Sequence, residues 1–306
     1  MTTECFVLAR AVHFAACLLF FGVFAFDRFV AVAVGRQSKV ISQWQARTRL
    51  LSLILLVVIL VSGIAWFALV SLAMGGRLQT EILKTVWERT QFGTVWKFRL
   101  AVWLVAVVAA AVPGFFQSHA ALVRILAWLE LVLGALVLGS LAWAGHGQET
   151  SNWHLFADIL HLLAAGFWPA GLLPFALLLY KLRRASESGQ WLWAALLVRR
   201  FSAVSLLVVA LLAVTGWVNT WFLVGSFSNL FQQPYGRWLL AKIILFCFAV
   251  AIGAVNLLRL KPRLSIGGEA GPAAARLQLN VWLELLLGVL IIVIVAILGI
   301  LPPAIG

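Results

Sequence analysis

The chain has 306 residues, of which 64% are hydrophobic and 11% are charged, and its formal net charge is +13. A soluble domain carries about 25% charged residues, so this composition excludes a water-soluble globular protein or a disordered chain and indicates an integral membrane protein. The three cysteines are too widely spaced for a CxxC site, and their odd number argues against a disulfide framework.

The sequence contains eight apolar runs, each long enough to cross a bilayer as a helix, which needs about 20 residues. In chain order they cover residues 5–34, 50–74, 94–112, 121–144, 153–180, 200–224, 237–260 and 277–301. Because the runs are continuous rather than alternating, they predict an all-α polytopic membrane protein and not a β-barrel. Between the second and third runs, residues 77–92 mix charges with large apolar side chains, which predicts an amphipathic helix on the membrane surface.

Positive charge is concentrated in the loops that follow the odd-numbered spans. These loops carry Arg36, Lys39, Arg47, Arg49, Arg124, Lys181, Arg183, Arg184, Arg199, Arg200, Arg259, Lys261, Arg263 and Arg276. By the positive-inside rule the odd loops are cytoplasmic, so both termini and the even loops are predicted to lie on the outer side. The net charge is therefore a signal of topology, and we expect lipid contact and no nucleic-acid partner. The first span is too long for a cleaved signal peptide and is expected to be retained.

The two halves of the chain resemble each other at four places. In order, the matches pair His13 with His161, Ser62-Gly63 with Thr215-Gly216, Phe92-Gly93 and Arg99 with Tyr235-Gly236 and Lys242, and residues 128–134 with residues 282–288. Their common order predicts a 4+4 duplication within one membrane domain, with residues 1–146 and 147–306 as the halves. Because each half has an even number of spans, the repeat is parallel, and its interface is the expected place for a site.

Four of the five histidines fall at the outer end of the predicted spans. His13 and His161 each lie about eight residues, roughly 12 Å, into a span, and His154 shares a helix face with His161. His146 ends the fourth span, and Cys17 lies one turn after His13. Imidazole is a common copper ligand, and the chain has only two methionines, so the sequence predicts a histidine-rich metal site rather than a methionine-lined one. For each histidine the alternative is a ring that is hydrogen-bonded to a neighbouring helix.

Three acids lie where they could assist such a site. Asp158 is one turn from both span-5 histidines and could orient an imidazole, although it could also face water at the helix entrance. Glu130 and Glu284 lie near the middle of the fourth and eighth spans and could carry protons. Pairing with Arg99 and Lys242 is the favoured prediction for them, because an unpaired carboxylate there is costly.

Several segments together resemble the bacterial copper resistance protein D (CopD) family. They are residues 8–15, residues 144–146, the block 157–168 (the most specific), residues 171–174, 201–202 and 215–216, and residues 235–242. The resemblance covers most of the chain and departs from the family at Pro169-Ala170, where Pro169 could kink the span below His161.

This resemblance implies an eight-span inner-membrane protein, and not an enzyme, that moves copper from the periplasm toward the cytoplasm. It also implies a separate periplasmic copper-binding partner of the CopC type, and it makes the predicted outer side periplasmic. Copper would meet His146 and His154 first and then be bound deeper by His13 and His161. An alternative from another class is a membrane redox protein in which His13 and His161 ligate a haem axially. A scaffold whose histidines only pack is a third possibility.

Overall fold

The computed structural model describes residues 2–32, 39–112, 119–144, 151–185, 189–266 and 268–304, and within these ranges the chain is helical and contains no strand. Its long helices, with their continuations, are α1 (Thr2–Phe26) with η1 (Asp27–Ala31), α3 (Lys39–Gly75), α5 (Gln91–Ala111), α6 (Ala120–Gly139) with η3 (Ser140–Ala144), α7 (Asn152–Arg184), α8 (Gln190–Val224), α10 (Pro234–Val255) with η5 (Asn256–Leu260) and α11 (Lys261–Arg263), and α12 (Ala270–Leu298). Eight helical stretches of the described chain are long and apolar enough to cross a membrane, which confirms the predicted spans.

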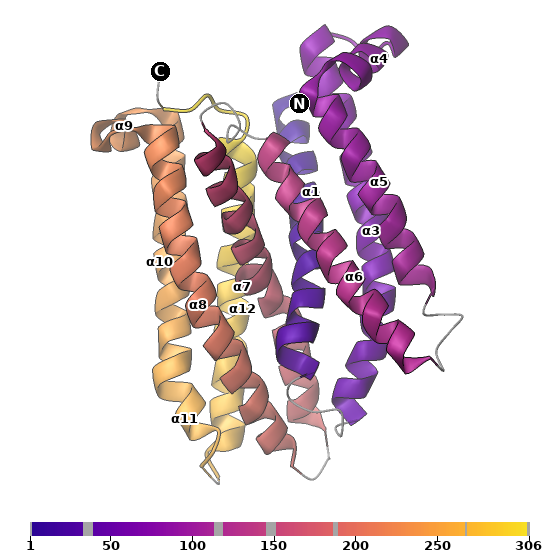
Figure 1. Ribbon diagram of the computed structural model, residues 1–306. Coiled ribbons are helices and arrows are strands. Elements are labelled where there is room, and N and C mark those ends of the chain that lie inside the picture. Colours follow the sequence, from indigo (N-terminus) through magenta and orange to yellow (C-terminus); the bar gives the residue numbers. More distant parts are fainter. Residues whose placement is uncertain are drawn as a thin grey trace.

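Two short helices lie at the end of the bundle where both termini are found (Figure 1). One is α4 (Thr80–Arg89), which lies within the predicted amphipathic segment 77–92, and the other is α9 (Phe227–Gln232). The location of α4 on the membrane surface stays a prediction. Each short helix packs on the span that follows it through a glycine. A Cβ at Gly93 or at Gly236 would collide with a backbone carbonyl oxygen of the short helix before it, which gives a packing reason for the matched Phe-Gly and Tyr-Gly pairs.

The central helix of the bundle is α1, which contacts helices of both the first four and the last four spans. It packs against α3 and α6 of its own half and against α7 and α12 of the other half. Helix α7 contacts α8 and α12 in the same way that α1 contacts α3 and α6. Near the end opposite the termini, the rings of Phe26 and Phe175 both contact Phe201, the latter stacked at 4.4 Å between centroids, so α1, α7 and α8 share one aromatic core.

Helix α7 is the element on which most of the predicted site residues lie. It begins at a cap, because the Ser151 hydroxyl oxygen accepts a hydrogen bond from the backbone N–H of His154. The helix then continues without a break through Pro169 and Pro174 as far as Arg184. Proline has no N–H, so Pro169 leaves the carbonyl oxygen of Ala165 without its usual helical donor.

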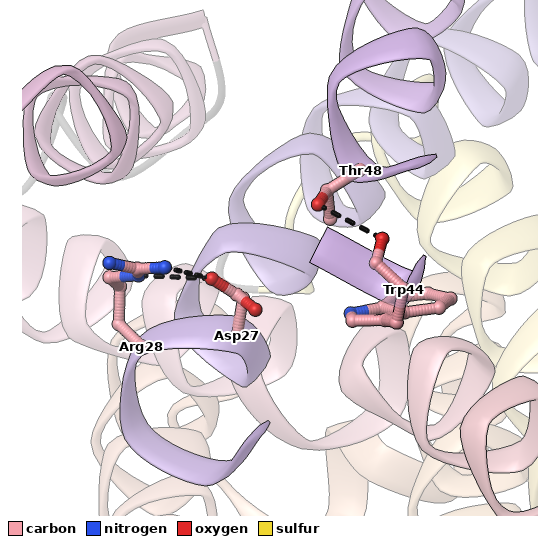
Figure 2. A network of polar contacts seen from close by, with 4 residues as sticks. All are labelled: Asp27, Arg28, Trp44 and Thr48. Atoms are coloured by element: carbon pink, nitrogen blue, oxygen red, sulfur yellow. Dashed lines mark hydrogen bonds and ion pairs between the residues drawn. The ribbon is translucent and has the colours of Figure 1, made fainter. Parts of the chain in front are cut away.

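The end of the bundle opposite the termini is the basic end. There α1 passes into the π-helical turn η1, where Arg28 forms an ion pair with the buried Asp27. Figure 2 shows this pair beside the start of α3, where the Thr48 hydroxyl donates to the carbonyl oxygen of Trp44 at 3.4 Å. The assignment of this end to the cytoplasm remains a prediction from its Lys and Arg content.

Candidate metal site between the two halves

His13 is fully buried, and both of its ring nitrogens are hydrogen-bonded. Nδ1 lies 3.0 Å from the hydroxyl oxygen of Ser62, and that hydroxyl donates to the carbonyl oxygen of Val58. Nε2 lies 2.6 Å from Nη2 of Arg99, which can only donate. The ring therefore carries its proton on Nδ1, and its lone pair on Nε2 is occupied by the guanidinium.

Arg99 holds the rest of this buried cluster together. Its Nη1 donates to the carbonyl oxygen of Val137 at 2.7 Å and to the hydroxyl of Ser140 at 2.6 Å, and its Nη2 also donates to Cys17 Sγ at 3.5 Å. As the helical spacing predicts, Cys17 lies beside His13, with 3.7 Å between Sγ and Nε2. A metal could reach this histidine and cysteine only if the arginine moved away.

His161 is held in the same way on one side of its ring but not on the other. Its Nδ1 lies 3.0 Å from the Thr215 hydroxyl oxygen, and that hydroxyl donates to the carbonyl oxygen of Leu211 at 2.7 Å. Nδ1 must therefore be the protonated nitrogen. Nε2 has no hydrogen-bond partner among the described residues, so its lone pair is available.

A glycine lies against each histidine ring, next to the residue that anchors it. A Cβ at Gly63 would approach Cε1 of His13 to 3.2 Å, and a Cβ at Gly216 would approach Cε1 of His161 to 3.3 Å. The matched Ser-Gly and Thr-Gly pairs therefore combine a hydrogen-bond acceptor with space for the ring. The sequence comparison found these pairs but did not assign them this role.

A cavity of about 580 Å³ is lined by α1 and by the helices of the second half, and His161 lies on its wall. His154 and Asp158 also line it, as does Ala165. These four residues follow one face of α7 at intervals of about one turn. His161 and Lys242 also line a second cavity of about 480 Å³, so the two cavities meet at these residues.

The remaining predicted ligands have different surroundings. The ring of His154 is buried and stacks on Phe222 at 4.9 Å, and Asp158 accepts a hydrogen bond of 3.0 Å from the Asn219 amide, not from an imidazole. His146 lies outside the described residues. Within the described part of the chain, no three His, Cys, Asp or Glu side chains come close enough to hold one metal ion together.

The predicted pairing of the mid-span acids with Arg99 and Lys242 is wrong. Arg99 binds His13 instead, and Glu284 accepts a hydrogen bond of 2.7 Å from Asn256 in the turn η5. Glu130 is buried, and its Oε1 has no partner among the described residues. Charge alone suggested the pairing, whereas Arg99 donates to Val137 and Ser140 at the end of α6 and to His13 on α1.

Two family models match this chain over most of its length. The model described as "Copper resistance protein D-like, N-terminal domain" matches residues 1–155, and the one described as "Copper resistance protein D" matches residues 195–298. The chain belongs to the copper resistance protein D family. It is 32% identical to copper resistance protein D of Pseudomonas syringae pv. tomato, over 97% of each chain. This confirms the resemblance found in the sequence.

Two further relatives agree with this membership of the CopD family. The chain is 28% identical to copper transport protein CutJ of Bacillus subtilis (strain 168) over 60% of this chain and 34% of the relative. It is 25% identical to inner membrane protein YebZ of Escherichia coli (strain K12) over 97% of this chain and 98% of the relative. No solved structure matches the chain. Together with its apolar helices, these names make it a multi-pass inner-membrane protein of a copper resistance and transport family.

Proposed function

We propose that this CopD-family protein moves copper across the inner membrane, from the periplasmic side toward the cytoplasm, through the cavity that His161 lines. The observation that carries the proposal is the state of the His161 ring. Its Nδ1–H is fixed by Thr215, and its Nε2 is available within a cavity. An imidazole whose second nitrogen is anchored in this way is the usual form of a histidine metal ligand.

The face of α7 supplies the route into this cavity. His154, Asp158, His161 and the Ala165 carbonyl oxygen each lie about one turn from the next. Such spacing suits stepwise transfer of copper between successive donors rather than one closed site. We assign His146 to the entrance, where a separate periplasmic copper-binding partner of the CopC type delivers the ion.

His13 and Cys17 have a structural role in this proposal. These two residues could bind copper only if Arg99 left Nε2 of His13. His161 could bind copper without any such movement, because no described residue occupies its Nε2. The haem alternative fits less well, because His13 does not line the cavity beside His161 and offers no free lone pair for axial ligation.

We place the passage toward the inner half at Glu284. This acid lines the cavity of about 480 Å³ with His161 and also lines a third cavity of about 140 Å³ with Asn256. It therefore lies where the outer and inner cavities meet, as a proton- or cation-accepting group on the route must. Its counterpart Glu130 lines none of these three cavities.

The duplication into halves 1–146 and 147–306 is part of the same proposal. The equivalent contacts of α1 and α7 support it, as do the equivalent hydrogen bonds from His13 to Ser62 and from His161 to Thr215. In this arrangement the two halves have the same orientation, and the cavity lies at their interface.

Copper uptake into liposomes tests the proposal. The purified chain is reconstituted, Cu(I) is supplied outside with a reductant, and a trapped chelating dye reports its entry. We expect His161→Ala to reduce the uptake rate at least tenfold and to remove equilibrium copper binding. His119→Ala is the matched control, because it removes a histidine at the opposite end of the bundle and is expected to leave uptake within twofold. Uptake by His161→Ala at the rate of the unmodified protein would refute the route, and a Soret band in the purified protein would favour haem.

A further inference from the structure

The cavity between α1 and the second half carries more positive than negative charge. Arg10 and Lys242 both line it, whereas Asp158 is the one acid among the described residues of its wall. A copper ion would add to this excess of positive charge in an environment of low dielectric constant. The cavity therefore lacks the charge balance expected of a site built for a bare cation.

Arg10 is the clearest sign of a missing partner. Its side chain is only 6% exposed, it donates no hydrogen bond to any described residue, and its Nε is completely buried. The rings of Phe14 and Trp66 lie 5.5 and 5.0 Å from its guanidinium carbon. Cation–π contacts of this kind stabilise the charge but leave the N–H groups at the edge of the guanidinium without acceptors.

Lys242 is the second cation of this wall. It makes no hydrogen bond and no ion pair within 4 Å with the described residues, and Asp158, which accepts a hydrogen bond from Asn219, attracts it only at longer range. One carboxylate therefore faces two cations. Lys242 lies eight residues after Pro234, where α10 begins, and Arg10 lies eight residues after Thr2, where α1 begins. Both are therefore about 12 Å from helix ends that Figure 1 places at the same end of the bundle.

The size and lining of the cavity indicate what these cations bind. About 580 Å³ is far more than a metal ion occupies, and most of the wall is formed by apolar side chains of α1, α7 and α12. We propose that the cavity binds an amphipathic organic oxyanion, whose charged head is held by Arg10 and Lys242 and whose apolar body fills the remaining space. The head could belong to a soluble carboxylate or to an anionic lipid.

This inference goes beyond copper transport and does not depend on it, because it concerns the protein without metal. If copper also enters the cavity, the oxyanion supplies the negative charge that the wall lacks. Copper would then be handled beside an anionic co-ligand and not as an isolated ion.

The test uses three six-carbon probes that differ only in charge. The full chain, free of metal, is placed in nanodiscs of phosphatidylcholine, and binding of hexanoate, hexanamide and hexylammonium is measured by saturation-transfer NMR against empty nanodiscs. We expect hexanoate to bind at least tenfold more tightly than hexanamide, and hexylammonium not to bind. Equal affinities for hexanoate and hexanamide would overturn the proposal.

Two variants and one control locate the probe. Arg10→Gln and Lys242→Gln are each expected to weaken hexanoate binding at least tenfold, and using both covers the case in which one fails to fold. Arg237→Gln removes an exposed positive charge from the same end of α10 and should leave the affinity unchanged. Unchanged affinity in both cavity variants would place the probe elsewhere and reject the site.

A final arm separates the two sources of the oxyanion. Phosphatidylglycerol is added to the nanodiscs at a fixed hexanoate concentration. Displacement of hexanoate identifies an anionic lipid as the occupant, and persistence of its signal identifies a soluble carboxylate. Copper uptake is measured independently on the same variants, so that failure of the oxyanion site and failure of the transport proposal are distinguishable.

Discussion

The surroundings of His13 and His161 differ in a way that separates a closed site from an open one. Both rings donate from Nδ1 to a hydroxyl and lie against a glycine, yet Arg99 occupies Nε2 of His13, whereas Nε2 of His161 lies beside a cavity. Lys242 is the residue that the sequence match between the halves pairs with Arg99. An arginine can reach a ring nitrogen, a hydroxyl and a carbonyl at once, whereas the lysine has one compact ammonium group.

The other residues around the two histidine rings also differ in size, with larger side chains around His13 than around His161. The offsets of the sequence matches pair Trp66 with Asn219 and Trp96 with Leu239, and they pair Cys17 with Ala165. The rings of both tryptophans contact His13, whereas the smaller residues of the second half all line cavity walls. The cavity beside His161 is therefore the volume that larger side chains fill in the first half. Under the proposed duplication, the same arrangement of helices forms a packed core in one half and an accessible site in the other.

The largest expected change in stability comes from removing a large buried side chain from the packed first half. Trp66 is 1% exposed, and Trp66→Ala should lower the free energy of unfolding by about 3 kcal/mol, because its neighbours cannot fill the space that the ring leaves. Asn219→Ala, at the paired position, removes fewer atoms from a wall that is already open, together with the hydrogen bond to Asp158, and should cost about 1 kcal/mol. The measurement is equilibrium unfolding in mixed micelles by titration with a denaturing detergent. Equal losses would mean that the two halves are packed alike.

Replacing Arg99 and Lys242 in turn tests whether the hydrogen bonds of Arg99 stabilise the packed surroundings of His13. Arg99→Met leaves the lone pair of His13 and the hydroxyl of Ser140 buried without a donor, which should cost about 2 kcal/mol of stability. Lys242→Met breaks no hydrogen bond with a described residue and should change stability by less than about 0.5 kcal/mol. The same unfolding assay applies. A larger loss for Lys242→Met than for Arg99→Met would reverse the comparison.

The two mid-span acids extend the comparison to transport. Glu284→Gln should lower the copper uptake rate about tenfold, equivalent to about 1.4 kcal/mol, because it removes the titratable carboxyl group where two cavities meet. Glu130→Gln makes the same chemical change at the paired position, which lines none of the three cavities, and should leave uptake within twofold. Equilibrium copper binding is expected to persist in both variants. Equal uptake by both variants would remove Glu284 from the route.

The sequence was sufficient for the architecture but not for the site. Continuous apolar runs determine where helices can cross a membrane, since lipid offers no partner for backbone groups, and this explains why all eight spans were correct. The partner of Arg99 could not be predicted, because a carboxylate and an imidazole both suit a guanidinium. Only the packing of both α5 and α1 against α6, with η3 beside α5, brings His13 and Ser140 within its reach. The cavity depends on side-chain volumes summed over several helices, which no single motif records.

The smallest expected effect comes from the glycines beside the two rings. A Cβ at Gly63 would meet the Trp96 ring at 2.6 Å as well as His13, so Gly63→Ala should cost about 1 to 2 kcal/mol through displacement of a packed indole. A Cβ at Gly216 meets only His161, whose Cε1 at 3.3 Å can shift by a few tenths of an ångström toward the cavity. The helix preference for alanine over glycine offsets that strain, so Gly216→Ala should leave the free energy of unfolding within about 0.5 kcal/mol of its original value.

Copper affinity is then the sensitive measurement for Gly216→Ala. A small tilt of the His161 ring moves Nε2 relative to the other donors of α7, so we expect a severalfold weaker equilibrium binding of copper with stability unchanged. Gly63→Ala should show the opposite pattern, with lower stability and unchanged copper affinity, because the lone pair of His13 is already occupied by Arg99. If Gly63→Ala weakened copper binding as much as Gly216→Ala, the metal would be sensitive to both rings and the division into a closed and an open site would fail.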